Sequence, residues 1–242
     1  MDRGLYIAAS GMLAEQTRQD QIANDLANAS TPGYKPDRSA QESFGRLMLE
    51  NRATGQQIGP LDLGTRIAVV RTDMTAAPLE QTGDSLDVAI DGEGFLAVQT
   101  PAGTRFTRNG QLVVDPQGRL ATATGFPLLD DKGQPIVVGN ANDLVIGADG
   151  TITRQGGKAA IAKIGVVSLT NPVKQGDTLF AGVPGPRPAQ TAVRQGFLEG
   201  SGVNPATAMV EMITSLRAFE SAQKAIQTID ETLDRGIQAG GA

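Results

Sequence analysis

Four acidic residues lie close together near the middle of the chain: Asp84, Asp87, Asp91 and Glu93. A pair of carboxylates can share general acid and base work, as in glycoside hydrolysis. The same stretch, however, alternates apolar with small or acidic residues, and Leu86, Val88 and Ile90 are the apolar set. Because period-two alternation is typical of a half-buried strand, we interpret the four acids as a solvated strand face.

Other residue sets that could carry chemistry are missing. The chain has no histidine and no cysteine, which excludes a Ser-His-Asp triad, a cysteine nucleophile and the usual zinc ligands. Gly92-Glu93-Gly94 lacks the third glycine and the following helix of a dinucleotide-binding loop. The sequence therefore predicts no enzymatic activity, no metal site and no cofactor.

Charge and hydropathy narrow the range of partners. Lys and Arg number 21 and Asp and Glu 26, a formal net charge of −5. That balance argues against binding to nucleic acid or to an anionic membrane, and no apolar run approaches the ~20 residues of a membrane span. The N-terminus lacks the basic start and continuous apolar core of a cleaved signal peptide. We expect either a cytoplasmic protein or one exported without a cleaved signal.

The first 30 residues predict a helix with a narrow apolar stripe. The stripe follows the 3-4 spacing of a helix seam and contains Leu5, Ala8, Met12, Ile22, Leu26 and Ala29. Glu15 and Gln19 interrupt it. Pro32-Gly33 then occupies the central positions of a predicted type II turn, which ends the helix.

The middle of the chain, residues 35–199, holds short β-type runs between Gly, Pro and Asx turns. Asn109-Gly110 is a strong signal for a two-residue hairpin. Further turns are predicted at residues 115–118, 130–133 and 147–150. This spacing predicts an antiparallel all-β domain over 84–199. Residues 31–83 are less regular, and we expect them to form an extended connecting segment.

The last segment, residues 200–242, predicts a second long helix. Asn204 is a favoured N-cap and Pro205 a favoured first helical residue. The helix is expected to fray near Gly236 and to end at Gly240-Gly241. Its apolar stripe contains Met209, Met212, Leu216, Phe219, Ile226, Leu233 and Ile237. Because both terminal stripes are thin, we expect the helices to need each other, or further copies, as partners.

Two asparagines near the end of the first helix allow two interpretations. Asn24 and Asn28 stand beside small alanines, although asparagine is a poor helix former. They could be caps of a fraying helix end. They could equally be part of a close-packed interface in which their side chains bond to a neighbouring backbone.

Four stretches resemble the flagellar basal-body rod and hook family. They are residues 23–35, ending in Thr31-Pro32-Gly33-Tyr34-Lys35, residues 87–95, residues 106–110, and residues 199–204 with the helical positions 212–224. Asp25 and Gly202 stand where that family usually has asparagine, which weakens any inference about side-chain contacts at those two positions.

The resemblance implies an α+β subunit of an axial assembly in the bacterial flagellum. The two terminal helices would pair as a coiled-coil-like inner domain, and the β domain would pack outside it. The chain would be exported without a cleaved signal and would assemble in the periplasm with other rod subunits and adjacent axial proteins. Contact with surrounding ring proteins is left open.

We predict the subunit interface from the helix stripes and the asparagines. Its residues are Leu5, Met12, Ile22, Asn24, Leu26, Asn28, Asn204, Met212, Leu216, Phe219, Ile226 and Leu233. The alternative from a different class is a monomeric β-rich binding module, whose termini would be short or would pack on its own β domain. A distal rod or hook subunit is a further alternative within the family.

Overall fold

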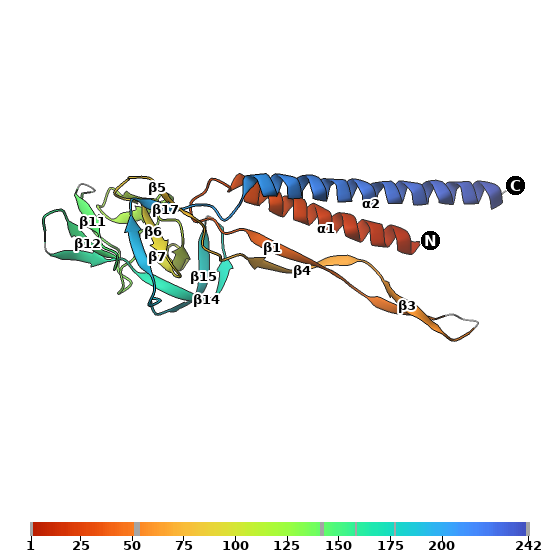
Figure 1. Cartoon of the computed structure of the whole chain (residues 1–242), viewed down its shortest axis with the longest axis horizontal. Coiled ribbons are helices and arrows are strands. Elements are labelled where there is room, and N and C mark those ends of the chain that lie inside the picture. The colour runs from red at the N-terminus through yellow and green to blue at the C-terminus, as the bar shows by residue number, and fades with distance from the viewer. Residues whose placement is uncertain (1, 51–53, 141–142, 158, 177, 241–242) are drawn as a thin grey trace. The chain divides into compact units, whose positions relative to one another are not determined.

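The computed structural model describes residues 2–50, 54–140, 143–157, 159–176 and 178–240. The chain forms two units and passes between them several times (Figure 1). The helical unit contains Met1–Ala27, Asp37–Arg71 and Asn204–Ala242. The β unit contains Asn28–Pro36 and Thr72–Val203. The chain is of the α+β class, as the sequence predicts.

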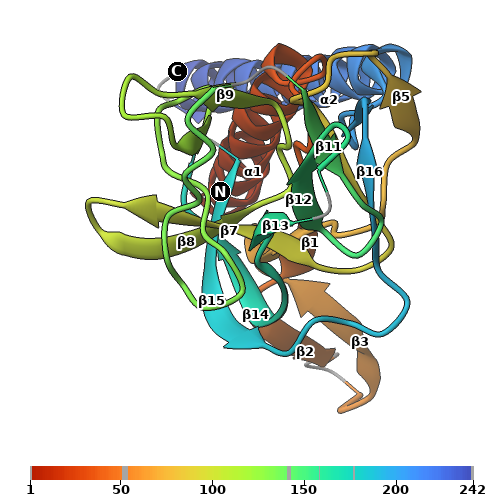
Figure 2. The same ribbon diagram turned by 90° about the vertical axis from the view of Figure 1, so that its left-hand side faces the viewer.

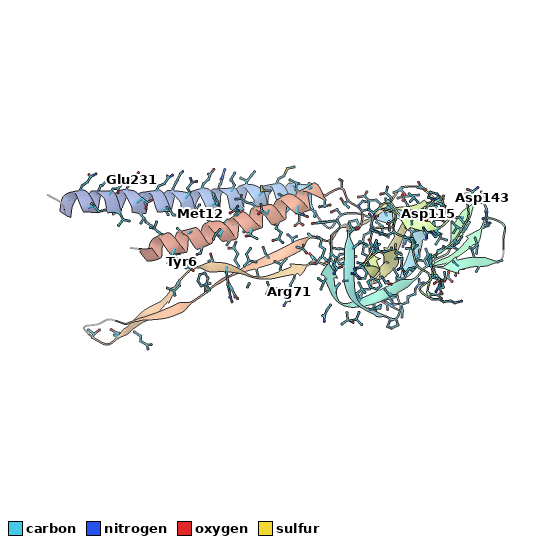
Figure 3. The ribbon with its side chains drawn as sticks, turned by 180° about the vertical axis from the view of Figure 1, so that it is seen from behind. Tyr6, Met12, Arg71, Asp115, Asp143 and Glu231 are labelled. Carbon is cyan, nitrogen blue, oxygen red and sulfur yellow. The ribbon has the colours of Figure 1, made fainter. Side chains whose placement is uncertain are left out.

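Two antiparallel helices form the main part of the helical unit, α1 (Asp2–Ala27) and α2 (Pro205–Gly240). Ser215 Oγ of α2 donates to Glu15 Oε2 of α1 at 2.6 Å, and a Cβ placed on Gly4 would lie 3.2 Å from Ile229. Figure 3 shows Met12 between the helices and Glu231 on the far side of α2. Neither described helix is long and apolar enough to cross a membrane.

The beginning of α2 confirms the predicted cap. Asn204 Oδ1 accepts hydrogen bonds from the backbone N–H groups of Ala206 at 3.0 Å and Thr207 at 3.3 Å, which satisfies two donors that the first helical turn leaves free. The expected fraying near Gly236 is wrong, because α2 continues to Gly240. Gly241 lies outside the described residues.

A ribbon of two paired stretches replaces part of the expected extended connection. It is formed by β1 (Asp37–Ser43), β2 (Arg46–Glu50), β3 (Gln57–Asp62) and β4 (Thr65–Thr72). β1 pairs with β4, and β2 pairs with β3 in antiparallel register. A two-stranded ribbon alone is marginally stable in water. Contacts with α1 support it: Tyr6 meets Phe44 edge-on at 6.1 Å, and Ser10 Oγ accepts from Thr65 N.

The β unit consists of short strands (Figure 2). Its buried side chains form a main aliphatic core and a smaller cluster that contains Phe95, Phe106 and Phe180. The strands are β5 (Leu79–Gln81), β6 (Val88–Asp91), β7 (Phe95–Thr100), β8 (Gly103–Thr107), β9 (Leu112–Val114), β10 (Leu120–Thr122), β11 (Leu144–Ile146), β12 (Thr151–Arg154), β13 (Ala160–Lys163), β14 (Val166–Lys174), β15 (Leu179–Gly185), β16 (Ala192–Gln195) and β17 (Phe197–Glu199). The pairings are antiparallel, as predicted.

Strand order brings the two ends of the β unit together. β14, β15, β8 and β7 close a small barrel, and β11, β12 and β13 form a three-stranded sheet. The first two strands of the unit, β5 and β6, pair with its last two, β17 and β16. The core between these sheets is aliphatic, with Leu96, Val98, Leu120, Leu128 and Ile152 fully buried. The scarcity of aromatic residues therefore does not prevent a continuous core.

Two turn predictions had different outcomes. Residues 115–118 form the predicted turn between β9 and β10, with Gly118 N donating to Asp115 O at 2.9 Å. The Asn109-Gly110 hairpin is wrong. β8 already pairs with β7 on one edge and β15 on the other, so it has no free edge for β9. Gly110 instead packs against β6, and Val88 N donates to Gly110 O at 3.0 Å.

The packing of Gly110 predicts a severe effect of a single methyl group. A Cβ at Gly110 would lie 1.5 Å from the carbonyl oxygen of Val88, so Gly110→Ala must displace β6 from the core. We expect Gly110→Ala to lower the free energy of unfolding by about 3 kcal/mol or more, measured by urea unfolding. The control is Gly11→Ala in α1, which has open space around it and no positive φ. Equal effects of the two substitutions would contradict this packing.

Candidate functional site

The segment that follows α1 is folded into the β unit. Tyr34 N donates to Thr31 O at 3.3 Å and Gly33 has a φ of 66°, which confirms the predicted turn at Pro32-Gly33. A side chain at Gly33 would also collide with the backbone of Arg108, since a Cβ would lie 2.4 Å from its carbonyl carbon. The turn therefore presses residues 28–36 closely against the end of β8.

A cluster of three charged side chains lies beside this turn. Lys35 Nζ is 2.6 Å from Glu199 Oε1, and both side chains are 1% exposed. Arg108 Nη1 is 3.2 Å from Glu199 Oε2 and is itself 5% exposed. We call Lys35, Arg108 and Glu199 the charge cluster. One carboxylate thus balances two buried cations.

Neighbouring groups take up most of the remaining bonding capacity of the charge cluster. Lys35 Nζ also donates to Thr75 O at 2.7 Å, and Ala77 N donates to Glu199 Oε1 at 2.9 Å. Arg108 lies over the Phe95 ring at 5.1 Å. Its Nε, among the described residues, is buried without a hydrogen-bond partner. Burial of charge is costly unless each charge is paired and hydrogen-bonded, so the cluster depends on the presence of all its members.

The sequence alone did not predict that these three charged side chains meet. Lys35, Arg108 and Glu199 stand in separate polar stretches, and each would ordinarily be read as a solvent-exposed charge. A usable signal was that each lies within two residues of a glycine inside one of the four stretches that resemble the flagellar family. Nothing local indicates that they meet, because their contact depends on strand pairings between distant segments.

The four acids first considered for chemistry have separate structural roles. Asp84 Oδ1 accepts from Leu86 N at 3.0 Å, and Asp91 forms a 2.6 Å ion pair with Arg194. Asp87 is 7% exposed, whereas Glu93 is exposed. The solvated-face interpretation is therefore wrong for Asp87. β17 packs against β6, so the strand is covered on both sides and Ala89 is also fully buried.

The helical unit covers most of the predicted interface residues within one chain. Covered positions of α2 recur at 3-4 spacing and are Ala208, Met212, Ser215, Phe219, Ala222, Ile226, Ile229 and Leu233. On α1, Leu5, Met12, Ile22 and Leu26 are buried or half-buried. Leu216 is different, because 47% of it is exposed.

A second apolar stripe on α2 is uncovered. We call Met209, Val210, Ile213 and Leu216 the outer stripe. Their exposed fractions are 53%, 64%, 52% and 47%, respectively. Three of these residues, Met209, Ile213 and Leu216, recur at helical spacing on one side of the helix. Contiguous exposed apolar surface of this kind marks an interaction site more often than chance exposure.

The three predicted asparagines occupy different environments. Asn204 caps α2. Asn28 lies in the β unit, where its Oδ1 accepts from Thr31 Oγ1 at 3.2 Å and its backbone oxygen accepts from Ser201 Oγ at 2.9 Å. Asn28 does not have a positive φ, so it is not a left-handed helix cap. Asn24 is exposed on α1.

Comparison with known proteins gives matches along the whole chain. Family models match residues 5–35 (flagella basal body rod protein), 89–154 (flagellar hook protein FlgE/F/G D1 domain) and 194–239 (flagellar basal body rod FlgEFG protein C-terminal). The flagellar basal-body rod protein FlgF of Escherichia coli is 35% identical, with 98% of each chain covered. The chain belongs to the flagellar basal-body rod family. FlgG of Bacillus subtilis is 32% identical over 96% of this chain and 97% of its own.

The family matches coincide with the charge cluster. Lys35, Arg108 and Glu199 fall one each in the three matched segments. The cluster therefore joins the N-terminal rod segment, the middle domain and the C-terminal rod segment within a single subunit. A second FlgF, that of Caulobacter vibrioides, is 31% identical over 100% of this chain and 99% of its own, so relatives of both names match nearly the whole chain.

Sharing of one carboxylate by two cations predicts unequal costs of substitution. Glu199→Gln leaves two buried cations without a counter-charge, and we expect it to lower the free energy of unfolding by about 3–5 kcal/mol. Lys35→Met leaves Glu199 paired with Arg108, and its effect should be smaller. Calorimetric unfolding of the full chain measures both. A larger loss for Lys35→Met than for Glu199→Gln would contradict the shared arrangement.

Proposed function

We propose that this chain is a structural subunit of the bacterial flagellar rod whose copies assemble through α1 and α2 into a tube that transmits torque. The observation that carries the proposal is the outer stripe of α2. α1 covers one side of α2 and leaves the stripe half exposed. A second copy supplies apolar surface of the same kind, since α1 also exposes Tyr6 at 60% and Leu13 at 65%.

The two apolar sides of α2 support a division of roles. The covered side holds α1 and α2 together within a subunit in coiled-coil-like spacing. The outer stripe contacts the next subunit, so Leu216 belongs to the interface between copies. Met12, Phe219 and Leu233 act indirectly, because they hold α1 and α2 together within each subunit. Repetition of one heterologous contact whose rotation does not close a ring produces an open helical assembly.

The position within the flagellum is part of the same proposal. Similarity to proteins named FlgF and FlgG supports a place in the periplasmic rod, beside other rod subunits and adjacent axial proteins. The short length, the start Met1-Asp2-Arg3 and the sequence Leu86-Asp87-Val88-Ala89 favour the proximal rod over the distal rod. Contact with ring proteins would involve the β unit.

A monomeric binding module is the weaker proposal. Such a module would bury the apolar surface of its terminal helices against its own domain. The outer stripe instead leaves four large apolar side chains near half exposure or above, which favours assembly.

Introduction of a charge into the outer stripe tests the proposal. Ile213→Glu should leave the thermal unfolding of the monomer unchanged, because Ile213 is 52% exposed. It should abolish assembly, since an unpaired carboxylate would be buried at every subunit contact. Incorporation into isolated basal bodies and swimming in a strain that lacks its FlgF-type protein are the readouts.

The matched control is Ala225→Glu, which adds the same charge at an exposed position of α2 on a different side of the helix from the outer stripe. Normal incorporation and swimming of Ala225→Glu, with loss for Ile213→Glu, supports the proposal. Normal swimming of both variants would refute assembly through the outer stripe.

A further inference from the structure

The charge cluster connects parts of the β unit that are far apart in sequence. Lys35 and Glu199 are separated by 164 residues. Lys35 lies in the first segment of the β unit, and Glu199 lies near its end, in the last strand. Their contact therefore forms only when both ends of the unit are present and folded.

Backbone hydrogen bonds join the same regions to one another. Gly33 N donates to Glu199 O at 2.8 Å, and Gly202 N donates to Tyr34 O at 2.9 Å. Gly200 N donates to Pro78 O at 2.9 Å. We call residues 28–36, 72–81 and 197–203 the exit segments, because the chain passes between the two units at both ends of the first segment and at one end of each of the others.

The order of docking follows from the electrostatics of Lys35. Without Glu199, the Lys35 ammonium would retain the Thr75 carbonyl at 2.7 Å but no counter-charge. A buried ammonium without a counter-charge is strongly disfavoured. Arg108 would face the same cost, with its Nε already lacking a partner among the described residues. Lys174 also contacts this segment, with its Nζ 2.8 Å from Lys35 O and 4.0 Å from the centre of the Tyr34 ring. Docking of residues 28–36 before Glu199 is in place would still bury Lys35 and Arg108 without a counter-charge.

We infer that the charge cluster is a latch that makes the three exit segments close and open as one cooperative group, with Glu199 required for closure. The N-terminal segment 28–36 stays undocked until the C-terminal strand β17 is in place. If the chain is threaded through an export channel, a partly emerged subunit remains unlatched until residue 199 has passed. That consequence rests on the proposed function, whereas the latch does not.

Hydrogen exchange of the full-length protein tests the latch. The exchange rates of the Gly33, Ala77 and Gly202 amides report the opening of segments 28–36, 72–81 and 197–203, respectively. Glu199→Gln should accelerate exchange of all three segments together by at least about tenfold. The control is Asp91→Asn, which breaks the Asp91–Arg194 ion pair, whose side chains are 44% and 53% exposed. That variant should leave the three segments unchanged.

Two outcomes overturn the inference. One is acceleration confined to residues 197–203, and the other is no acceleration in any segment. If Glu199→Gln unfolds the whole β unit, the test is made on the wild-type protein instead. Native-state hydrogen exchange at low denaturant concentration then measures the opening free energy of each exit segment. A common opening free energy for the three segments supports the latch, and different opening free energies refute it. Neither result depends on whether the chain assembles into a rod.

Discussion

Burial of Glu199 between Lys35 and Arg108 is the interaction on which the arrangement of the β unit depends. One carboxylate, 1% exposed, balances two cations that come from segments 91 and 164 residues away. Buried charges add little net stability compared with apolar packing, but they penalise every arrangement that leaves one of them alone. The cluster thus selects a single way to bring the first and last strands together, and β5 with β17 and β6 with β16 complete it.

The two units solve the problem of apolar burial differently. The β unit buries its apolar side chains in its own, mainly aliphatic core. Hydrogen bonds within the unit also fix the segments at which the chain enters and leaves it. The helical unit does not complete its burial, since α2 has a covered side and an outer stripe that remains half exposed. This contrast is what the proposed assembly requires, because neighbouring copies would then complete the burial of the helices.

Local signals predicted the parts of the fold that depend on short-range chemistry. The Asn204 cap, the turn at Pro32-Gly33 and the helical spacing of the two stripes could be read from the sequence, because each depends on residues within one turn or one helix. The ribbon of β1–β4, the true packing of Gly110 and the charge cluster could not. Each depends on contacts between segments that are far apart in the sequence. Asn109-Gly110, for example, is a strong hairpin signal, but no hairpin can form there because β7 and β15 already pair with both edges of β8.

The central claim is that the outer stripe of α2 becomes a contact between copies, and thiol accessibility tests it most directly. The chain has no cysteine, so Ile213→Cys and a control on another side of α2, Ala225→Cys, each introduce a single thiol. The alkylation rate of each thiol can be measured in the monomer and in assembled rods. We expect both thiols to react rapidly in the monomer and assembly to slow strongly only the thiol at position 213. Equal rates for position 213 before and after assembly would contradict it.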